Sequence, residues 1–213
     1  MIKLILKKLR LLVLSHQREK NLANIISKQI LILTKKKTEI NILDYGSGFE
    51  PLVINLIYKN ISNKYKRVNI NCCDYYKDNE IKKLNKKNNK IKFYKIDKLR
   101  SIKKKYDISI CADVLHHAGI ENLDNIKNIL LFLRNKSTYV LIKDHYEYSI
   151  FSRCILRFMD FIGNYYNGVT IPKKYFTKNL FLTIVRKSNL RIYKVIDDYR
   201  YYSRLHFIKI LKK

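Results

Sequence analysis

From residue 39 onward, short apolar runs alternate with stretches that have the spacing of amphipathic helices. The strand-type runs fall at 40–44, 68–73, 91–96, 106–111 and 138–142. The helix-type stretches between them fall at 51–61, 79–84 and 122–133. A strand, a helix and a second strand at this spacing form a βαβ unit, whose two strands are parallel. The chain is therefore predicted to form an α/β fold around a mainly parallel sheet.

The residues after 145 complete this predicted sheet. Two further helices and two closing strands are expected at 150–162, 176–188, 190–196 and 203–211. The predicted fold is a three-layer sandwich, with a seven-stranded, mostly parallel, Rossmann-like sheet and helices on both faces. Residues 1–38 have a helical pattern and are expected to pack on the domain formed by residues 39–213. Because only five Gly and two Pro occur and none forms a linker, we expect one domain.

The chain is strongly basic, with 45 Lys and Arg against 17 Asp and Glu and a formal net charge of +28. Such an excess is typical of proteins that bind nucleic acid or anionic membranes. Here the excess is mostly lysine, and abundant Asn and Ile accompany it, as AT-rich coding sequence produces. The lysine runs at 35–37, 82–83, 86–87 and 103–105 fall between the apolar segments. We therefore predict a solvated cationic surface and no nucleic-acid partner.

The first fourteen residues, MIKLILKKLRLLVL, combine apolar and basic side chains. Lysine or arginine at positions 3, 7, 8 and 10 keeps every apolar stretch far below the roughly 20 residues that a membrane span needs. No small-residue cleavage site follows, as a signal peptide would require. The segment is expected to be a basic amphipathic helix that packs on its own domain or lies on a membrane surface, in a cytoplasmic protein.

The four cysteines, at positions 72, 73, 111 and 154, have no CxxC or Cys/His spacing. Two of them are adjacent within one apolar run and a third ends another run. This pattern favours buried free thiols in a reducing compartment. We expect no metal site.

The strongest local motif is ILDYGSGFEP at 42–51. A predicted strand ends at Asp44, and Gly46 and Gly48 then form a tight turn before a helix. In a doubly wound sheet, ligands bind at the carboxyl ends of strands where the strand order reverses. Glycines at this turn allow a ligand to approach the backbone, and an acidic residue there would pair with a cationic ligand group. The alternative is an ordinary turn, since a single GxG occurs widely.

Two more carboxylates follow predicted strands. Asp74 directly follows the second strand, where a carboxylate accepts hydrogen bonds from the two hydroxyls of a ribose. Asp97 follows the third strand, where it would reach an adenine amino group. The alternatives are a helix N-cap for Asp74 and a loop cap for Asp97. A fourth segment, YDISICADVLHHAG at 106–119, leads from the fourth strand toward a helix.

The order of these motifs resembles that of class I S-adenosylmethionine-dependent methyltransferases, especially the small-molecule branch. The resemblance extends over about residues 39 to 145, and the closing helix and strands fit the same seven-stranded sheet. It implies S-adenosyl-L-methionine as the cofactor. Its methionine part would be flanked by Asp44, Gly46, Ser47, Gly48 and the backbone near Ala112. Its ribose would be held by Asp74 beside Tyr75, and its adenine by Asp97 with Lys98.

One residue departs from the family pattern, and the absence of two motifs argues against two classes of methylation reaction. Glu50 stands where the family usually has a third glycine, at a helix start where the helix dipole favours an anion. Enzymes that methylate the amino groups of bases carry an Asn/Asp-Pro-Pro-Tyr run after the fourth strand, but residues 112–115 read Ala-Asp-Val-Leu. No Pro-Cys pair is present for a covalent cysteine mechanism.

Three histidines are candidate general bases because neutral imidazole accepts a proton near neutral pH. They are His116, His117 and His145, and all follow predicted strand ends. The alternative is that His116 or His117 only caps and packs the next helix. Asp144 is a further candidate as a base or as a residue that orients one.

The polar and aromatic connection at 160–175 is expected to cover the acceptor pocket. Arg153 and Arg157, one helical turn apart, would grip a carboxylate or phosphate there, or form part of a solvated helix face. The predicted activity is methylation of a small-molecule, lipid-linked or glycan-linked acceptor at oxygen, nitrogen or carbon. The alternatives are an RNA methyltransferase that uses the basic surface, and an inactive cofactor-binding protein that serves as an interaction partner.

Overall fold

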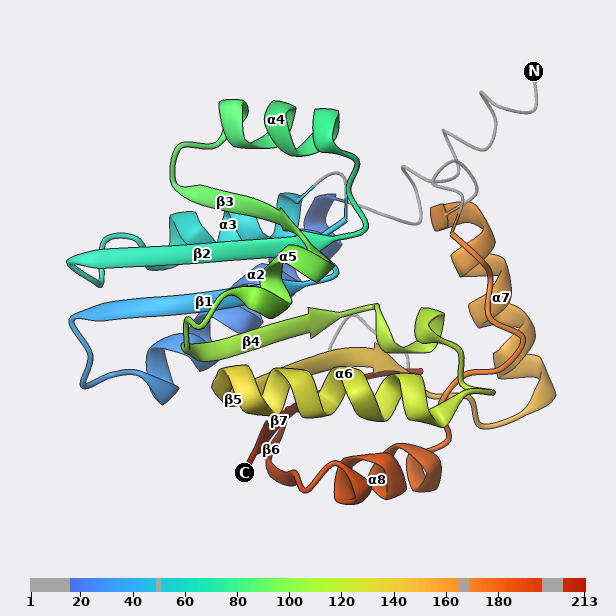
Figure 1. Cartoon of the computed structure of the whole chain (residues 1–213). Coiled ribbons are helices and arrows are strands. Elements are labelled where there is room, and N and C mark those ends of the chain that lie inside the picture. Colours follow the sequence, from blue (N-terminus) through green and yellow to red (C-terminus); the bar gives the residue numbers. More distant parts are fainter. Residues whose placement is uncertain (1–15, 49–50, 165–168, 197–204) are drawn as a thin grey trace.

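The computed structural model describes residues 16–48, 51–164, 169–196 and 205–213. Seven strands in these residues form one sheet in the order β3-β2-β1-β4-β5-β7-β6 (Figure 1). The strands are β1 (Glu39–Tyr45), β2 (Arg67–Asp74), β3 (Ile91–Lys95), β4 (Tyr106–Ala112), β5 (Ser137–His145), β6 (Arg191–Ile196) and β7 (His206–Lys212). The first five pair in parallel, and β7 is antiparallel to both β5 and β6.

The strand order reverses between β1 and β4. From β1 the chain continues outward through β2 to β3, and it then returns to β4 on the other side of β1. The crossover connections after β1 and β4 therefore leave in opposite directions, and in open α/β sheets ligands bind at the carboxyl ends of strands at such a reversal. The motifs at 44–48 and 112–117 both lie at this edge.

Helices cover both faces of the sheet. They are α2 (His16–Leu33), α3 (Leu52–Ile61), α4 (Asp78–Lys87), α5 (Ile96–Ser101), α6 (Leu123–Lys136), α7 (Ile150–Asn164) and α8 (Lys178–Lys187), with a 3-10 turn η1 (Leu115–Ala118). One hydrophobic core joins the sheet to α5, α6 and α8, and a second core joins the other face to α2, α3 and α4. Two cores on opposite faces of one sheet make a three-layer sandwich, so the predicted fold class is confirmed.

Alternation along each strand explains how both cores form. In β1, Leu43 belongs to one core, whereas its neighbour Ile42 belongs to the other. In β2 the adjacent thiols of Cys73 and Cys72 divide in the same way. Successive side chains of a strand point to opposite faces, and a parallel sheet buried on both faces needs apolar residues at both positions. This requirement accounts for the continuous apolar runs in the sequence.

The element boundaries differ from the predicted ones at a few places. The third strand ends at Lys95 rather than Ile96, and a short helix that the sequence pattern did not predict, α5, begins there. Pro51 precedes α3 as its N-cap instead of occupying its first turn. The helix α8 begins after Thr177, whose hydroxyl oxygen accepts a hydrogen bond from the backbone N–H of Leu180.

The N-terminal region is described from residue 16. The helix α2 packs on the sheet through buried Leu22, Ala23, Ile26 and Ile30. Residues 1–15, on which the amphipathic-helix prediction rests, lie outside the described residues, so the division at residue 38 stays a prediction. Among the residues that are described, no helix has the length and apolar character needed to cross a membrane.

Candidate functional site

The turn after β1 requires glycine at residue 46. Gly46 and Gly48 have φ angles of +77° and +69°, in the left-handed region that favours glycine. A Cβ atom added at residue 46 would lie 2.3 Å from Cγ2 of Val114, whereas one added at residue 48 meets no atom within 4 Å. The close contact at Gly46 brings the segment after β4 directly against the turn after β1.

Hydrogen bonds tie this turn to the end of β2. The backbone N–H of Gly46 donates to the carbonyl of Cys73 over 2.8 Å, and that of Gly48 donates to Asp74 Oδ2 over 2.8 Å. The Tyr76 hydroxyl lies 2.7 Å from the Gly48 carbonyl and 2.6 Å from the Ser47 hydroxyl. The structure thus brings the GxG turn and the carboxylate after β2 together.

Asp74 is not a helix N-cap, because the helix that follows begins at Asp78 with Lys77 as its N-cap. One carboxylate oxygen of Asp74 accepts from Gly48 and the other accepts from the backbone N–H of Tyr75 over 2.7 Å. A carboxylate has about four acceptor positions, so these two bonds leave capacity for further donors. The side chain of Tyr75 itself is largely exposed.

Asp44 is a buried carboxylate, and no cationic side chain in the described part of the chain pairs with it. Its Oδ2 lies 3.9 Å from the Cys72 thiol, a weak donor. Burial, followed by repulsion from Asp74, raises the pKa of Asp44 to about 7. The negative charge of Asp44 therefore lacks compensation in the protein, at a position where a bound cation would supply it.

Asp97 and Lys98 lie in the first turn of α5, and both are exposed. Asp97 is not the N-cap of α5, since Lys95 holds that position. Lys95 pairs with Asp74 in the register of β3 and β2, so Asp97 lies at the same edge of the sheet, two residues farther on. Glu50 lies outside the described residues.

The segment after β4 adopts a constrained conformation. Ala112 is half-buried at the end of the strand, and Asp113 has a φ of +57°, which is uncommon for a residue with a side chain. The backbone N–H of Asp113 donates to the Lys143 carbonyl over 2.8 Å, and its carboxylate forms an ion pair with the buried ammonium of Lys143. This pairing fixes the end of β4 against β5 and directs Val114 toward Gly46.

His116 lies between two carboxylates. Its Nδ1 is 2.6 Å from Asp144 Oδ1, and its Nε2 is 3.3 Å from Asp160 Oδ2. Burial disfavours the charged imidazolium, but the two carboxylates outweigh burial and raise the pKa of His116 to about 10. His116 is therefore protonated at neutral pH and does not accept a proton there.

His117 differs from His116 in its protonation. Its Nδ1 is 3.2 Å from the Thr170 carbonyl oxygen, which only accepts, so we assign the proton to Nδ1. Its Nε2 then carries the lone pair and lies 3.5 Å from the Asn164 amide nitrogen. Burial and the charge of His116 lower the pKa of His117. His117 is neutral near pH 7 and partly accessible, as a general base requires.

His145 and Asp144 are fully enclosed. Asp144 accepts from the backbone N–H groups of Leu115 (3.1 Å) and His145 (2.8 Å) besides its contact with His116. Burial raises the pKa of Asp144, but the His116 imidazolium and the side chain of His145 outweigh burial and hold this pKa low. Burial and the Lys143 ammonium keep the pKa of His145 well below the ordinary value. Asp144 thus orients the histidine cluster, and His145 is sealed from an acceptor.

The helix α7 brings residues that sequence reasoning missed. The carboxylate of Asp160 contacts His116 and accepts a 2.5 Å hydrogen bond from the Tyr175 hydroxyl. Asp160 and Tyr175 are 44 and 59 positions beyond His116, so no local spacing links them. The only local signal was that Asp160 is the one acidic residue of α7.

Arg153 is engaged within the protein. Its guanidinium makes two 2.8 Å hydrogen bonds to Glu147, which also accepts from the backbone N–H of Tyr175 over 2.9 Å. Arg153 therefore fixes α7 and the 169–175 segment, and it is not free to grip an acceptor. Arg157 is exposed. Residues 165–168 of the expected cover lie outside the described residues.

Two groups of side chains in the described residues have the spacing of metal ligands. They are His116 with Asp144 and His145, and His116 with His117 and Asp160, whose donor atoms lie within 4.8 Å of one another. Both groups share His116, whose two ring nitrogens already face carboxylates. This arrangement suits a proton on His116 better than a metal ion, because metal ligation needs a deprotonated nitrogen.

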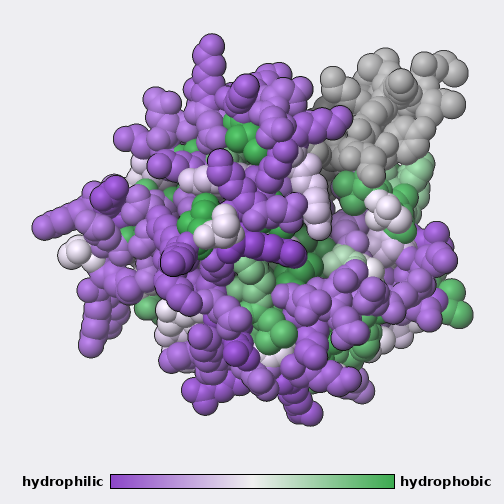
Figure 2. Space-filling model, in the orientation of Figure 1, coloured by the Kyte–Doolittle hydropathy of each residue, from purple (hydrophilic) through white to green (hydrophobic). Residues whose placement is uncertain are grey.

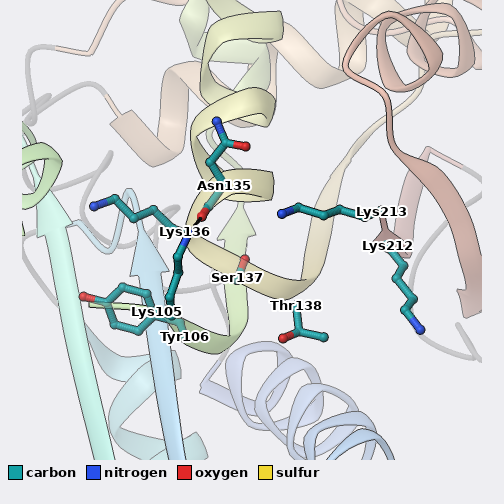
Figure 3. Close-up of a pocket in the computed structure, with 8 residues that line it drawn as sticks. All are labelled: Lys105, Tyr106, Asn135, Lys136, Ser137, Thr138, Lys212 and Lys213. Atoms are coloured by element: carbon teal, nitrogen blue, oxygen red, sulfur yellow. Dashed lines mark hydrogen bonds between the residues drawn. The ribbon is translucent and has the colours of Figure 1, made fainter. Parts of the chain in front are cut away.

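A pocket of about 310 Å³ lies at the opposite edge of the sheet (Figure 3). It is lined by Lys105, Tyr106, Asn135, Lys136, Ser137, Thr138, Lys212 and Lys213. The strands β4 and β5 begin at this edge, so the pocket is remote from the carboxyl-edge motifs. Two of its lysines donate to backbone carbonyls, Lys105 to Asn135 over 2.5 Å and Lys136 to Ile102.

No protein-family model matches the sequence, and no curated protein matches it. Solved structures do match. The mitomycin 7-O-methyltransferase MmcR is 14% identical, with a TM-score of 0.60 over 82% of this chain and 49% of that one. An O-methyltransferase family protein from Burkholderia thailandensis is 9% identical, with a TM-score of 0.64 over 91% and 55%. The chain thus spans about half the length of these two proteins.

A third structure has a length closer to that of this chain. The S-adenosylmethionine-dependent methyltransferase from Clostridium acetobutylicum ATCC 824 is 12% identical, with a TM-score of 0.57 over 89% of both chains. These similarities establish a common fold. The chain therefore has the methyltransferase fold that the resemblance of its motifs implied.

Proposed function

We propose that this chain is an S-adenosyl-L-methionine-dependent methyltransferase that acts on a small-molecule, lipid-linked or glycan-linked acceptor. The observation that carries the proposal is the buried carboxylate of Asp44 beside the glycine turn. A buried anion without a cationic partner is costly, and a cationic ligand removes that cost. The cofactor carries an ammonium and a sulfonium group, which makes it a suitable ligand for this position.

The surrounding residues fit the rest of the cofactor. The positive-φ glycines leave room for a ligand close to the backbone. Asp74 retains acceptor capacity for the ribose hydroxyls, and Asp97 with Lys98 would meet the adenine at the neighbouring strand end. When bound, the cofactor supplies an electrophilic methyl group, so the protein has only to bind, orient and deprotonate the acceptor.

We assign the proton-accepting role to His117 Nε2. His117 is neutral and partly accessible, whereas His116 holds its proton between two carboxylates and His145 is enclosed. His116 would then position α7 and keep His117 neutral through its own positive charge. Of the three candidate histidines, His117 is thus the proposed base, His116 is a positioning residue and His145 has no role in proton transfer.

The lysines are spread over the molecule and do not gather at the carboxyl edge alone, which favours a small acceptor over RNA. Four lysines gather around the pocket at the opposite edge of the sheet (Figure 3), and others lie on α4. Figure 2 shows that most of this view of the molecule is hydrophilic. An RNA methyltransferase would concentrate its basic side chains around the carboxyl edge, where the methyl group is expected.

The test is incubation of the protein with methyl-labelled cofactor and a cell extract, followed by separation into lipid, glycan, RNA and small-molecule pools. We expect label in one of the lipid, glycan or small-molecule pools, and none with the Asp44→Asn variant. Label confined to RNA would contradict the acceptor assignment. Cofactor binding without label in any pool would favour an inactive binding protein.

A further inference from the structure

The amino edge of the sheet, opposite the candidate site, carries a row of cationic side chains. Arg67 is the first residue of β2, and Arg191 is the first residue of β6. Lys105 and Lys136 directly precede β4 and β5, and Lys213 directly follows β7, which runs antiparallel to β5. These five residues are called the amino-edge row. They belong to five of the six adjacent strands in the order β2-β1-β4-β5-β7-β6.

The register keeps the members of the row at nearly the same level of the sheet. The first residues of β4 and β5 pair with each other, so Lys105 and Lys136, one position earlier on each strand, are level too. Arg191 pairs with Lys212, the neighbour of Lys213, on β7. Neighbouring strands lie about 4.8 Å apart, so the row spans roughly 24 Å from β2 to β6. The row is therefore long and narrow.

Few acidic side chains compensate this charge. Glu39, which pairs with Arg67 in the register of β1 and β2, is the one acidic residue of the described chain at the level of the row. Asp107 lies two residues beyond Lys105 and is held by Lys37 Nζ over 2.5 Å. The other described acids lie at or near the carboxyl edge, where strands end and helices begin. Charge is therefore divided between the two edges of the sheet.

Neither composition nor helix dipoles account for this division. AT-rich coding sequence raises the number of lysines, but it does not select one edge of a folded sheet. The negative end of a helix dipole favours cations, which explains Lys136 in the last turn of α6. Arg67, Lys105, Arg191 and Lys213 lie outside the helices, so their position at this edge needs another reason.

The charges of the row lie close enough to repel one another. Lys105 Nζ donates to the Asn135 carbonyl over 2.5 Å, and Lys136 Nζ donates to the Ile102 carbonyl. Burial, followed by the charge of Lys105, lowers the pKa of Lys136. An ammonium group has three donors, so each lysine keeps at least one for an anion. A bound polyanion would relieve this repulsion.

The arrangement suits an extended anion better than a compact one. Lys105, Lys136, Lys212 and Lys213 line the pocket of about 310 Å³ at this edge. Figure 3 shows that their ammonium groups point in different directions and do not converge on one point. The phosphates of a nucleic-acid strand follow one another along a line, as the members of the row do.

An exposed tyrosine stands at one end of the row. Tyr193 of β6 is 53% exposed, and Lys212 Nζ lies 5.9 Å from its ring centroid. Proteins that bind single-stranded nucleic acid combine cations that follow the backbone with aromatic rings on which bases stack. The ring beside the cations therefore favours nucleic acid over an anionic membrane. A membrane at this edge would also leave the candidate site facing away from the bilayer.

We infer that the amino-edge row and Tyr193 bind single-stranded RNA, through its phosphates and one stacked base. The lysine-rich composition predicted a solvated surface without a nucleic-acid partner. The inference departs from that prediction because the register gathers the charges along one line. The RNA would be a docking partner and not the methyl acceptor, since the row lies opposite the candidate site. The inference concerns binding alone and does not depend on the proposed methyl transfer.

The test is fluorescence anisotropy of a labelled RNA of about 12 nucleotides, titrated with the protein at several salt concentrations. The affinity of the wild type should fall linearly with salt on logarithmic axes. The Arg67→Gln/Lys105→Gln/Arg191→Gln/Lys213→Gln variant should bind at least tenfold more weakly. Its salt slope should be smaller by about 3, because each phosphate contact of a single strand contributes about 0.7.

The matched control removes four exposed lysines that lie away from the row, in the variant Lys82→Gln/Lys83→Gln/Lys173→Gln/Lys178→Gln. It changes the net charge by the same amount. Because salt screens distant charges, the control should keep the wild-type slope and bind within about threefold of the wild type. Circular dichroism should show both variants folded.

A separate variant tests the stacked base. Tyr193→Ala should weaken RNA binding at least fivefold and leave the salt slope unchanged, because it removes a ring and no charge. Val195→Ala is its control, since Val195 is also exposed on β6 and offers no ring for stacking. This control should bind like the wild type.

Four results would overturn the inference. The first two are no RNA binding by the wild type at low salt, and equal losses of affinity in the row variant and its lysine control. The third is equal competition by polyglutamate of similar length, which would show that any polyanion suffices. The fourth is binding to vesicles with about 30 mol% phosphatidylglycerol in the absence of RNA binding, which would make the edge a membrane contact. All these assays omit the cofactor, so their failure would leave the proposed methyl transfer unaffected.

Discussion

Gly46 connects the turn after β1 with the segment after β4 through its close approach to Val114. Its backbone has a positive φ, and its Cα faces the side chain of Val114. A methyl group at this position would force either the turn or the segment after β4 to move. The glycine is therefore needed for the fold of the site as well as for the approach of a ligand.

We expect Gly46→Ala to lower the free energy of unfolding by about 2–4 kcal/mol, from backbone strain and the clash with Val114. The measurement is urea unfolding followed by circular dichroism. Gly163→Ala is the matched control, since a Cβ there meets no atom within 4 Å and the residue lies in α7. The control should be unchanged or more stable by about 0.5–1 kcal/mol. Equal stability of the two variants would contradict the contact.

His117 is predicted to act as the base, so its removal should affect the rate and spare cofactor binding. We expect His117→Gln to slow methyl transfer to the labelled pool by about 100-fold or more. In the wild type the rate should be flat above neutral pH and fall only below the ordinary histidine pKa of 6.5, because the pKa of His117 is lowered. An unchanged rate in the variant would remove His117 from the mechanism.

At the scale of elements, α7 is held on the sheet by buried polar contacts. Asp160 contacts His116 of η1, and Glu147, two residues beyond β5, pairs with Arg153 of α7. The position of α7 therefore depends on the charge of His116.

The raised pKa of His116 makes stability depend on pH. A raised pKa contributes stability that is fully present below about 6.5 and is lost as the pH rises through about 10. We expect the wild type to lose more stability than the His116→Gln variant between pH 7 and pH 9.5, measured by urea unfolding at each pH. Parallel losses in the two proteins would show that His116 carries no such linkage.

Asp160 should matter more for stability than an exposed acid. Asp160→Asn leaves the His116 imidazolium with one carboxylate, and we expect a loss on the order of 3 kcal/mol at pH 7. Asp124→Asn, at an exposed position in the first turn of α6, is the control and should change stability by less than about 0.5 kcal/mol. A similar small change in both variants would contradict the role of Asp160 in holding α7.

The elements of the fold were predictable because each strand and helix repeats a local pattern. The apolar runs at 40–44 and 106–111 and the helical stripe at 122–133 match β1, β4 and α6 closely. The helix α5 was missed because its six residues span less than two turns, too few for a helical periodicity to emerge. The end of the third strand was placed at Ile96 instead of Lys95 because Ile96 begins this short helix.

Only those residues of the candidate site that directly follow the predicted strands could be predicted from the sequence. Asp44, the glycines and Asp74 meet because consecutive parallel strands end at one edge of the sheet. The relation between Asp144, His116 and Asp160 depends on how α7 folds back over that edge, which no spacing in the sequence encodes. His116 is protonated and the adjacent His117 is neutral because of those contacts, so this difference could not be predicted from the sequence either.

At the scale of the whole molecule, a cationic cofactor would bind at one edge of the sheet in a chain that is itself strongly cationic, with a net charge of +28. Binding therefore depends on local compensation, and Asp44 is the group that supplies it. With a pKa of about 7, Asp44 is mostly protonated at pH 6 and must lose its proton to bind a cation.

The most direct test is isothermal titration calorimetry with S-adenosylmethionine at pH 6, in two buffers of different ionisation enthalpy. We expect binding with the release of most of one proton at pH 6, a smaller release at pH 8, and no such release by the Asp44→Asn variant. That variant should also bind at least tenfold more weakly at pH 8. Absence of binding heat, or a proton release that Asp44→Asn leaves unchanged, would contradict the account.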